Sequence, residues 1–265
     1  MTKAKELIDR LSSSRQDLWH KFELLQWFKN TDTSLKKALF SLPEDFDGFL
    51  TELANKPDEL DNIDLLRLIR LERGNYLIVP VFEVRSQETN QIFTYEYVSW
   101  KVGSYPGYKG ILLVEENGHI SHFITKTITK FSQNTEVYDS FGGFIEFKDR
   151  HLINLSTAQE KEIKRQLGLD DLIIKEFIDL GHLTPDIGMT NNRSSLFAAI
   201  IDGSEAKNLD LSAPLKTKGI SFKIAIHPIS ELPHFLSKIE DSYFLSAVSR
   251  LIALGRLPLN LTSTT

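Results

Sequence analysis

The hydrophobic pattern of this 265-residue chain changes at Gly74, and that change constrains the fold more than any other feature. Before it, from Leu7 to Phe22 and beyond, apolar residues recur at spacings of three, four and seven, which is the stripe of an amphipathic helix. We therefore predict an all-helical N-terminal lobe over residues 1–73. Its later helices are expected at residues 34–42, 45–54 and 58–70.

After Gly74, β-branched and aromatic residues dominate the pattern. Residues 76–84 and 91–100 are typical of two strands, and the polar segment between them predicts a hairpin over residues 76–100. A second hairpin is expected at residues 110–120. There, Asn117 and Gly118 supply the positive-φ residues that a tight turn needs.

One helix of this second region carries signals at both ends. A capping box of Ser156 with Gln159, or of Thr157 with Glu160, marks its start, and Gly168 suits the left-handed position just after its end. Strands flanking this helix, with another helix at the end, predict an α/β (α+β) sandwich over residues 74–265. The other elements are expected at residues 172–180, 193–201, 221–227 and 229–254, the last broken near residue 241.

Composition excludes several classes of protein and partner. With no cysteine, the chain has no disulfide framework, no Cys-ligated zinc site and no thiol nucleophile, and we expect a cytoplasmic protein. The sequence contains no run of about 18 apolar residues, so we predict no membrane-spanning helix. The net charge of -5, with 12 Lys/Arg against 14 Asp/Glu in residues 1–73, makes nucleic acid an unexpected partner.

The helix before Gly168 resembles part of a known motif. Gly168 and Leu169 match the last two positions of the box G-x5-E-x7-R-E-U-x-E-E-x-G-U, where U is aliphatic, and Ile163 matches its earlier aliphatic position. Lys161 and Glu162 match its Arg-Glu pair. In these positions the chain resembles the Nudix superfamily. The paired glutamates of the box fall on Arg165 and Gln166, and its first glutamate falls on Ile153.

Other stretches resemble the ADP-ribose pyrophosphatase-like branch of that superfamily. Gly142 and Gly143 resemble the glycine pair that opens the box, with four extra residues before the helix. Residues 184–188 and 196–199 resemble the family's Pro-Gly loop and the strand after it. The resemblance implies a Nudix-type α/β/α sandwich with a mixed sheet, its core at residues 110–258. It also implies a homodimer, because the hairpin of residues 76–100 has the position at which such proteins exchange strands.

The substitutions in the box bear on its chemistry. The resemblance implies hydrolysis of a diphosphate with the help of Mg²⁺ or Mn²⁺, which glutamates of one helix bind. These cations need several oxygen ligands. Here Glu162 alone remains as the candidate catalytic and metal-binding residue. Arg165 lies on the same helix face, where it repels a cation and can pair with Glu162. A solvated surface ion pair is the simpler interpretation of these two residues. Likewise, Gly142 and Gly143 form either a phosphate-facing loop or a tight turn.

The leading hypothesis is a catalytically impaired domain that binds a small anionic, nucleoside-diphosphate-type ligand, ADP-ribose or a nucleotide sugar, as a sensor or scaffold. The alternative is an active pyrophosphohydrolase that takes Mg²⁺ or Mn²⁺ ligands from Glu146, Glu160, Asp179 or Asp186. A transcription regulator is a third hypothesis, against which the acidic N-terminal lobe argues. The expected ligand-binding residues are Gly142, Gly143, Lys161, Arg165, Gln166, Arg193 and Trp100.

Overall fold

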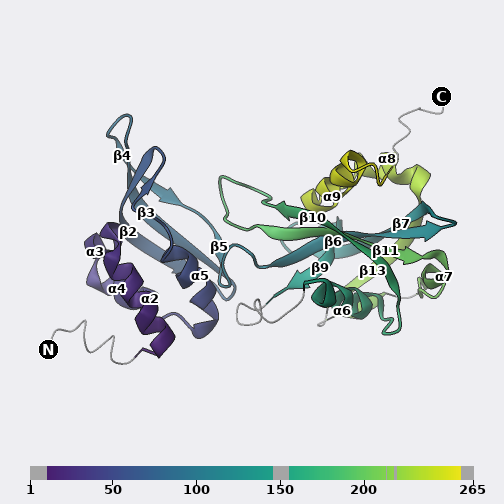
Figure 1. Cartoon of the computed structure of the whole chain (residues 1–265), viewed down its shortest axis with the longest axis horizontal. Coiled ribbons are helices and arrows are strands. Elements are labelled where there is room, and N and C mark those ends of the chain that lie inside the picture. Colours follow the sequence, from purple (N-terminus) through teal and green to yellow (C-terminus); the bar gives the residue numbers. More distant parts are fainter. Residues whose placement is uncertain (1–10, 146–154, 213, 218–219, 258–265) are drawn as a thin grey trace. The chain divides into compact units, whose positions relative to one another are not determined.

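The computed structural model describes residues 11–145, 155–212, 214–217 and 220–257 (Figure 1). The chain forms two compact units. The first holds the residues up to 106 together with the later segment Asp186–Arg193, and the second holds Gly107–Ile145 and most of the chain that follows.

In the first unit, helices pack against a five-stranded sheet of order β1-β2-β3-β4, with β5 paired to β3. Aromatic and leucine side chains fill the core between them, among them Trp27, Phe28, Leu50 and Phe82. The helices are α2 (Ser13–Leu24), α3 (Gln26–Asn30), α4 (Thr33–Phe40), the 3-10 helix η1 (Glu44–Phe46) and α5 (Asp47–Leu53). The strands are β1 (Glu59–Leu60), β2 (Ile63–Arg73), β3 (Leu77–Ser86), β4 (Ile92–Glu96) and β5 (Ser99–Trp100).

The helix predicted at residues 58–70 is wrong, because this segment forms β1 and most of β2. Strand β2 shows register shifts between Leu65 and Arg67 and between Leu68 and Arg70, so its burial does not alternate regularly. Its two buried residues, Leu65 and Leu68, are three apart, which imitates the spacing of a helix. The N-terminal lobe is therefore helical only to Leu53, and the hairpin predicted at residues 76–100 joins its sheet as β3, β4 and β5.

The second unit is built on a mixed sheet of order β10-β11-β6-β7-β13-β12, in which β11 and β6 are parallel. Its strands are β6 (Gly107–Glu116), β7 (His119–Lys130), β8 (Thr135–Asp139), β9 (Phe141–Phe144), β10 (Ile174–Leu183), β11 (Ser194–Asp202), β12 (Leu215–Thr217) and β13 (Ile220–Pro228). Its helices are α6 (Leu155–Leu167), α7 (Gly203–Ala206), η3 (Ile229–Glu231), α8 (Leu232–Leu236) and α9 (Ser242–Ala253). The predicted strands and helices of this region are thus confirmed.

Both faces of this sheet are covered by helices (Figure 1). Side chains alternate between the two faces along β6. Leu112 and Val114 therefore belong to the core under α6, and Ile111 and Leu113 belong to the core under α9. The predicted α/β/α sandwich is therefore confirmed. The tight turn between β6 and β7 is also confirmed, with φ of 54° at Asn117 and 80° at Gly118.

Candidate functional site

Helix α6 carries the residues that match the box. Ile163 and Leu167 are buried against the sheet, and Gly168 follows the helix with a φ of +69°, which favours glycine. Gln159 and Gln166 are also buried, with 5% and 4% of their surface exposed. A polar side chain buried this deeply needs hydrogen-bond partners, and those of Gln166 define the site.

Glu162 is held by two neighbours on its own helix. Arg165 donates from Nε to Glu162 Oε2 at 2.8 Å and from Nη2 to Oε1. Gln166 Nε2 donates to the same Oε1 at 2.7 Å. Both carboxylate oxygens therefore accept hydrogen bonds from the protein. The side chain of Glu162 is 16% exposed and that of Arg165 is 36% exposed, so the pair is partly buried on the glutamate side.

The two glycines opposite the helix lie in a strand. Gly142 and Gly143 belong to β9, where they pair with Lys109 and Tyr108 of β6, so the expected loop or tight turn is wrong. A Cβ on Gly142 would lie 2.1 Å from the carbonyl oxygen of Tyr108, and one on Gly143 would lie 3.2 Å from carbons of the Glu162 side chain. Close packing against the backbone of β6 therefore requires glycine at position 142, whereas a Cβ at position 143 would be tight only against side-chain atoms. The Gly142 carbonyl accepts from Gln166 Nε2 at 2.7 Å.

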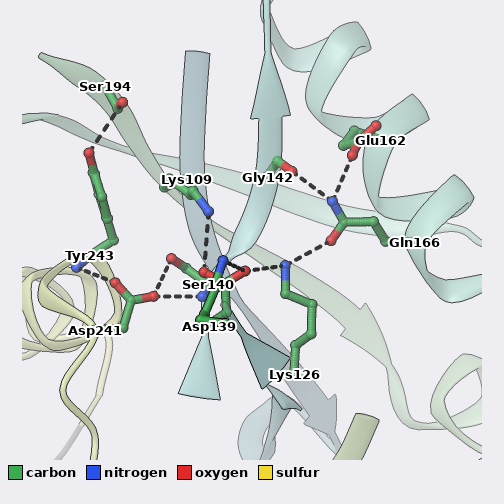
Figure 2. Close-up of polar contacts among 11 residues, drawn as sticks. Lys109, Lys126, Asp139, Ser140, Gly142, Glu162, Gln166, Ser194, Asp241 and Tyr243 are labelled. Atoms are coloured by element: carbon green, nitrogen blue, oxygen red, sulfur yellow. Dashed lines mark hydrogen bonds and ion pairs between the residues drawn. The ribbon is translucent and has the colours of Figure 1, made fainter. Parts of the chain in front are cut away.

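Beneath the helix, Gln166 contacts a buried lysine (Figure 2). Lys126 Nζ lies 3.4 Å from Gln166 Oε1 and 3.0 Å from Asp139 Oδ2. Lys109 and Lys130 contact the same carboxylate, at 3.3 and 3.4 Å. We call Lys109, Lys126, Lys130 and Asp139 the lysine cluster.

Strand pairing explains this convergence. Strands β6 and β7 pair with each other between their shared turn and the pair formed by Leu112 and Ile124. On the side of that pair away from the turn, the two strands separate. From there β6 pairs with β9 and β7 pairs with β8, where Asp139 is directly opposite Lys126. The cluster thus lies where the sheet divides.

Burial and charge act against each other in the lysine cluster. Burial lowers the pKa of Lys126, which Asp139 partly restores. Burial would raise the pKa of Asp139, but Lys109, Lys126 and Lys130 outweigh it and hold that pKa at about 2. Three ammonium groups therefore face one ionised carboxylate.

The polar contacts continue from β8 toward α9. Ser140, next to Asp139, donates from its backbone N and its Oγ to Asp241 Oδ2, at 2.6 and 2.5 Å (Figure 2). Asp241 caps α9 by accepting from the backbone N of Tyr243 at 2.9 Å. Tyr243 OH lies 3.4 Å from Ser194 Oγ. The break predicted near residue 241 is therefore a helix cap that is tied to the sheet.

The structure brings together only part of the expected ligand-binding set. Gly142, Gly143, Glu162, Arg165 and Gln166 are in contact, and exposed Lys161 is on the same helix. Trp100 and Arg193 belong to the first unit. Trp100 pairs with Leu77 in that unit's sheet, and the guanidinium of Arg193 lies 5.6 Å from the ring centroid of Tyr105.

The described residues around Glu162 do not fit a divalent cation, because Arg165 and Gln166 already donate to its oxygens. Elsewhere, no group of three or more His, Asp or Glu residues within the described ranges is arranged to hold a metal. Among the proposed alternative ligands, Glu160 pairs with Lys164 at 2.9 Å and Asp179 accepts from the backbone N of Gly181 at 2.8 Å. Asp186 belongs to the first unit, and residues 146 and 153 lie outside the described ranges.

Sequence reasoning missed the lysine cluster. Lys126 and Lys130 are four apart in a strand, so alternation assigns them to one face, and Ile124 and Ile128 assign that face to the core. That pattern is the available signal. It predicts a buried lysine with a carboxylate partner, but the partner's identity depends on the pairing of β7 with β8.

Comparison with known proteins supports the fold. The sequence matches no known family model and no curated protein. Among solved structures, the chain is similar to one described as the crystal structure of an ADP compounds hydrolase, with 12% sequence identity and a TM-score of 0.54. The match covers 75% of this chain and 99% of that one. No helix among the described residues is long and apolar enough to cross a membrane. The chain has a Nudix-like α/β/α fold.

Proposed function

We propose that the second unit binds a nucleoside-diphosphate-type ligand, ADP-ribose or a nucleotide sugar, and acts as a sensor or scaffold rather than a hydrolase. One observation carries the proposal. The carboxylate that the box would use for a metal is hydrogen-bonded at both oxygens by Arg165 and Gln166. A diphosphate here meets cationic side chains directly, without a bridging metal.

The charges along α6 favour Lys161 as the first phosphate contact. Lys164 pairs with Glu160 and Arg165 pairs with Glu162, whereas exposed Lys161 has no ion pair among the described residues. A lysine without a counter-ion loses no existing pair when it contacts a phosphate. The Arg165 side chain is 36% exposed, so its outer face is also accessible.

Calorimetry with ADP-ribose, NAD, UDP-glucose and coenzyme A, each with and without EDTA, tests this proposal. We expect at least one ligand to bind with an affinity that EDTA does not change. Replacing Lys161 with Gln should weaken that binding about tenfold, the usual effect of losing one charge-assisted hydrogen bond. Lys164→Gln is the matched control, because that lysine already has a partner on the same helix. Failure of all four ligands, or binding only with Mg²⁺, would contradict the proposal.

The alternative, a metal-dependent pyrophosphohydrolase, is favoured by the fold shared with a structure described as an ADP compounds hydrolase. Chromatography of the same ligands after incubation with Mg²⁺ or Mn²⁺ tests it through the hydrolysis product, which is a nucleoside monophosphate or, from coenzyme A, adenosine 3′,5′-bisphosphate. Product that disappears in Glu162→Gln would establish this alternative. No product from any ligand would exclude these substrates.

We also propose that the protein is a cytoplasmic homodimer that pairs through β4. This strand is one edge of its sheet, all its residues are exposed, and Ile92, Phe93 and Tyr95 are 57%, 38% and 41% exposed. An exposed apolar edge is a site for strand pairing. Light scattering should give a dimer mass that Phe93→Lys reduces, and a monomer at all concentrations would rule the dimer out.

A further inference from the structure

The first unit contains a cavity on one face of its sheet, next to the edge strand β4. Its volume is about 270 Å³, and its lining residues come from β1 to β4 and from the segment that follows α5. The cavity therefore lies within that unit. A cavity of about 150 Å³ already holds a benzene molecule, so this one has room for a small aromatic compound.

The inner and outer sides of the cavity differ in exposure. Phe82 and Tyr97, on the inner side, are 1% and 8% exposed, but Leu60 and Tyr95 are 40% and 41% exposed. Tyr95 is directly opposite Phe82 in the sheet and so lies on the same face. Trp27 of α3 packs on Phe82, whereas Tyr95 on the edge strand stays accessible. The cavity therefore presents apolar surface that a ligand can reach, and pairing along the backbone edge of β4 would leave it open.

Lys56 is the one amine in the lining. Its Nζ lies 4.7 Å from the ring centroid of Tyr97. The side chain is partly buried, and it makes no ion pair and no hydrogen bond with any described residue. Lys126, by contrast, contacts Asp139 and Gln166 and is 6% exposed. Lys56 thus combines partial burial, an unpaired amine and an adjoining cavity.

The surroundings of Lys56 favour its neutral form. Burial lowers the pKa of Lys56, although Glu52 acts to raise it. The oxygens of Glu52 already have other donors. Oε1 accepts from the backbone N and the Oγ of Ser104, both at 2.6 Å, and Oε2 accepts from Asn191 Nδ2 at 3.2 Å. A lowered pKa increases the fraction of uncharged amine at neutral pH, and the uncharged amine is the nucleophile.

The charges in the lining favour a neutral partner. Asp61, in the turn between β1 and β2, is its one carboxylate, and Lys56 is its one cation. An anionic ligand would meet Asp61, and a cationic ligand would meet Lys56. A neutral molecule with a flat apolar body suits the accessible surface of Tyr95 and Leu60. A carbonyl group on such a molecule would lie within reach of the amine.

We propose that Lys56 binds a small neutral aromatic aldehyde covalently, as a Schiff base. The ring of the aldehyde packs against Tyr95 and Leu60, and its carbonyl carbon faces Lys56 Nζ. The nitrogen lone pair forms the C–N bond, the two amine protons pass to the carbonyl oxygen, and that oxygen leaves as water, which gives C=N. The reaction is reversible and needs no oxidant or reductant. It involves no residue of the second unit, so it is independent of the function proposed above.

Reductive trapping on the full chain tests the site. Sodium cyanoborohydride converts the imine of benzaldehyde into a stable benzylamine, and peptide mass spectrometry locates it. We expect Lys56 to be modified at least about tenfold faster than Lys21, because the cavity holds the aldehyde beside the amine. Lys21 is the reference, because it is an exposed lysine of α2 outside the cavity. The rate at Lys56 should saturate with benzaldehyde concentration, whereas that at Lys21 should rise in proportion.

Variants separate recognition from reactivity. Tyr95→Ala removes the accessible ring, so the benzaldehyde reaction at Lys56 should slow about threefold to tenfold, as for loss of one aromatic contact. Acetaldehyde has no ring, so its reaction at Lys56 should not change. Tyr76→Ala is the matched control, because Tyr76 is an exposed tyrosine of the same unit outside the cavity. Lys56→Arg should remove the saturable modification from the intact protein, and circular dichroism confirms that each variant is folded.

Three results would overturn the proposal. They are modification of Lys56 no faster than that of Lys21, a rate at Lys56 that does not saturate, or a benzaldehyde reaction that Tyr95→Ala slows no more than the acetaldehyde reaction. None of these measurements uses a nucleotide or a residue of the second unit. Failure here is therefore distinguishable from failure of the nucleotide-binding proposal.

Discussion

The two units of the chain use lysine in opposite ways. In the second unit, the lysine cluster places three ammonium groups within 3.0 to 3.4 Å of one partly buried carboxylate, that of Asp139. In the first unit, Lys29, Lys36 and Lys37 make no ion pair with any described residue, and Lys36 Nζ lies over the ring of Phe28 and donates to the Lys29 carbonyl. Lys126 is buried and therefore depends on its counter-ion, whereas Lys36 is only partly buried and has no ion pair to lose.

The largest expected effect comes from removing the counter-ion of the lysine cluster. Asp139→Asn leaves Lys126 buried with no opposite charge and with two other lysines nearby. Breaking a buried pair in this way costs about 3–5 kcal/mol, which urea unfolding measures. Glu136→Gln in the same strand is the control, because its partner Lys223 is 65% exposed and such pairs contribute at most about 1 kcal/mol. Equal losses in the two variants would show that the cluster does not stabilise the fold.

The same variant should change how stability depends on pH. The pKa of Asp139 is lowered from 3.8 to about 2, because its three lysines outweigh burial, which would raise it. A folded-state pKa below the unfolded value stabilises the protein above pH 4, and this stability is lost as pH falls from about 4 to about 2. The loss amounts to about 2 kcal/mol by linkage. The difference in unfolding free energy between wild type and Asp139→Asn should therefore shrink over that range.

A smaller effect is expected at α6, where the protein's own donors occupy Glu162. The double variant Arg165→Glu with Gln166→Glu removes both donors and places three carboxylates on one helix face. We expect Mn²⁺ to bind it at least about tenfold more tightly than wild type, a difference of about 1.4 kcal/mol. Electron paramagnetic resonance of free Mn²⁺ measures this directly. If wild type binds Mn²⁺ as tightly, Arg165 and Gln166 do not exclude the metal.

Local signals predicted most of the second unit. The cap signals of α6, the Asn117-Gly118 turn and the alternating strands all depend on neighbours in sequence. Strand β2 was missed because its register shifts replace alternation by a spacing of three. Local spacing cannot distinguish a bulged strand from a helix when the apolar residues are three apart.

The candidate site was predictable only where it lies within one helix. The pairing of Glu162 with Arg165 follows from their spacing of three residues. The bond from Gln166 to Gly142, and the contact of Lys126 with Asp139, depend instead on strand register. The placement of Arg193 in the first unit depends on the path of residues 186–193, where Val98 bonds to Met189 and Asn191. No local pattern encodes these contacts.

The smallest expected effect on the free energy of unfolding is that of a substitution at Lys36, in the first unit. Lys36→Met removes one hydrogen bond to the Lys29 carbonyl and a cation–π contact, but no ion pair. It also removes a charge that burial disfavours, as the lowered pKa of Lys36 indicates. These contributions oppose each other, so the unfolding free energy should change by less than about 1 kcal/mol, the size of the cation–π contact alone. Urea unfolding of Lys36→Met beside Asp139→Asn measures both under the same conditions. A loss as large as that of Asp139→Asn would mean that the fold depends on Lys36 as strongly as on the lysine cluster.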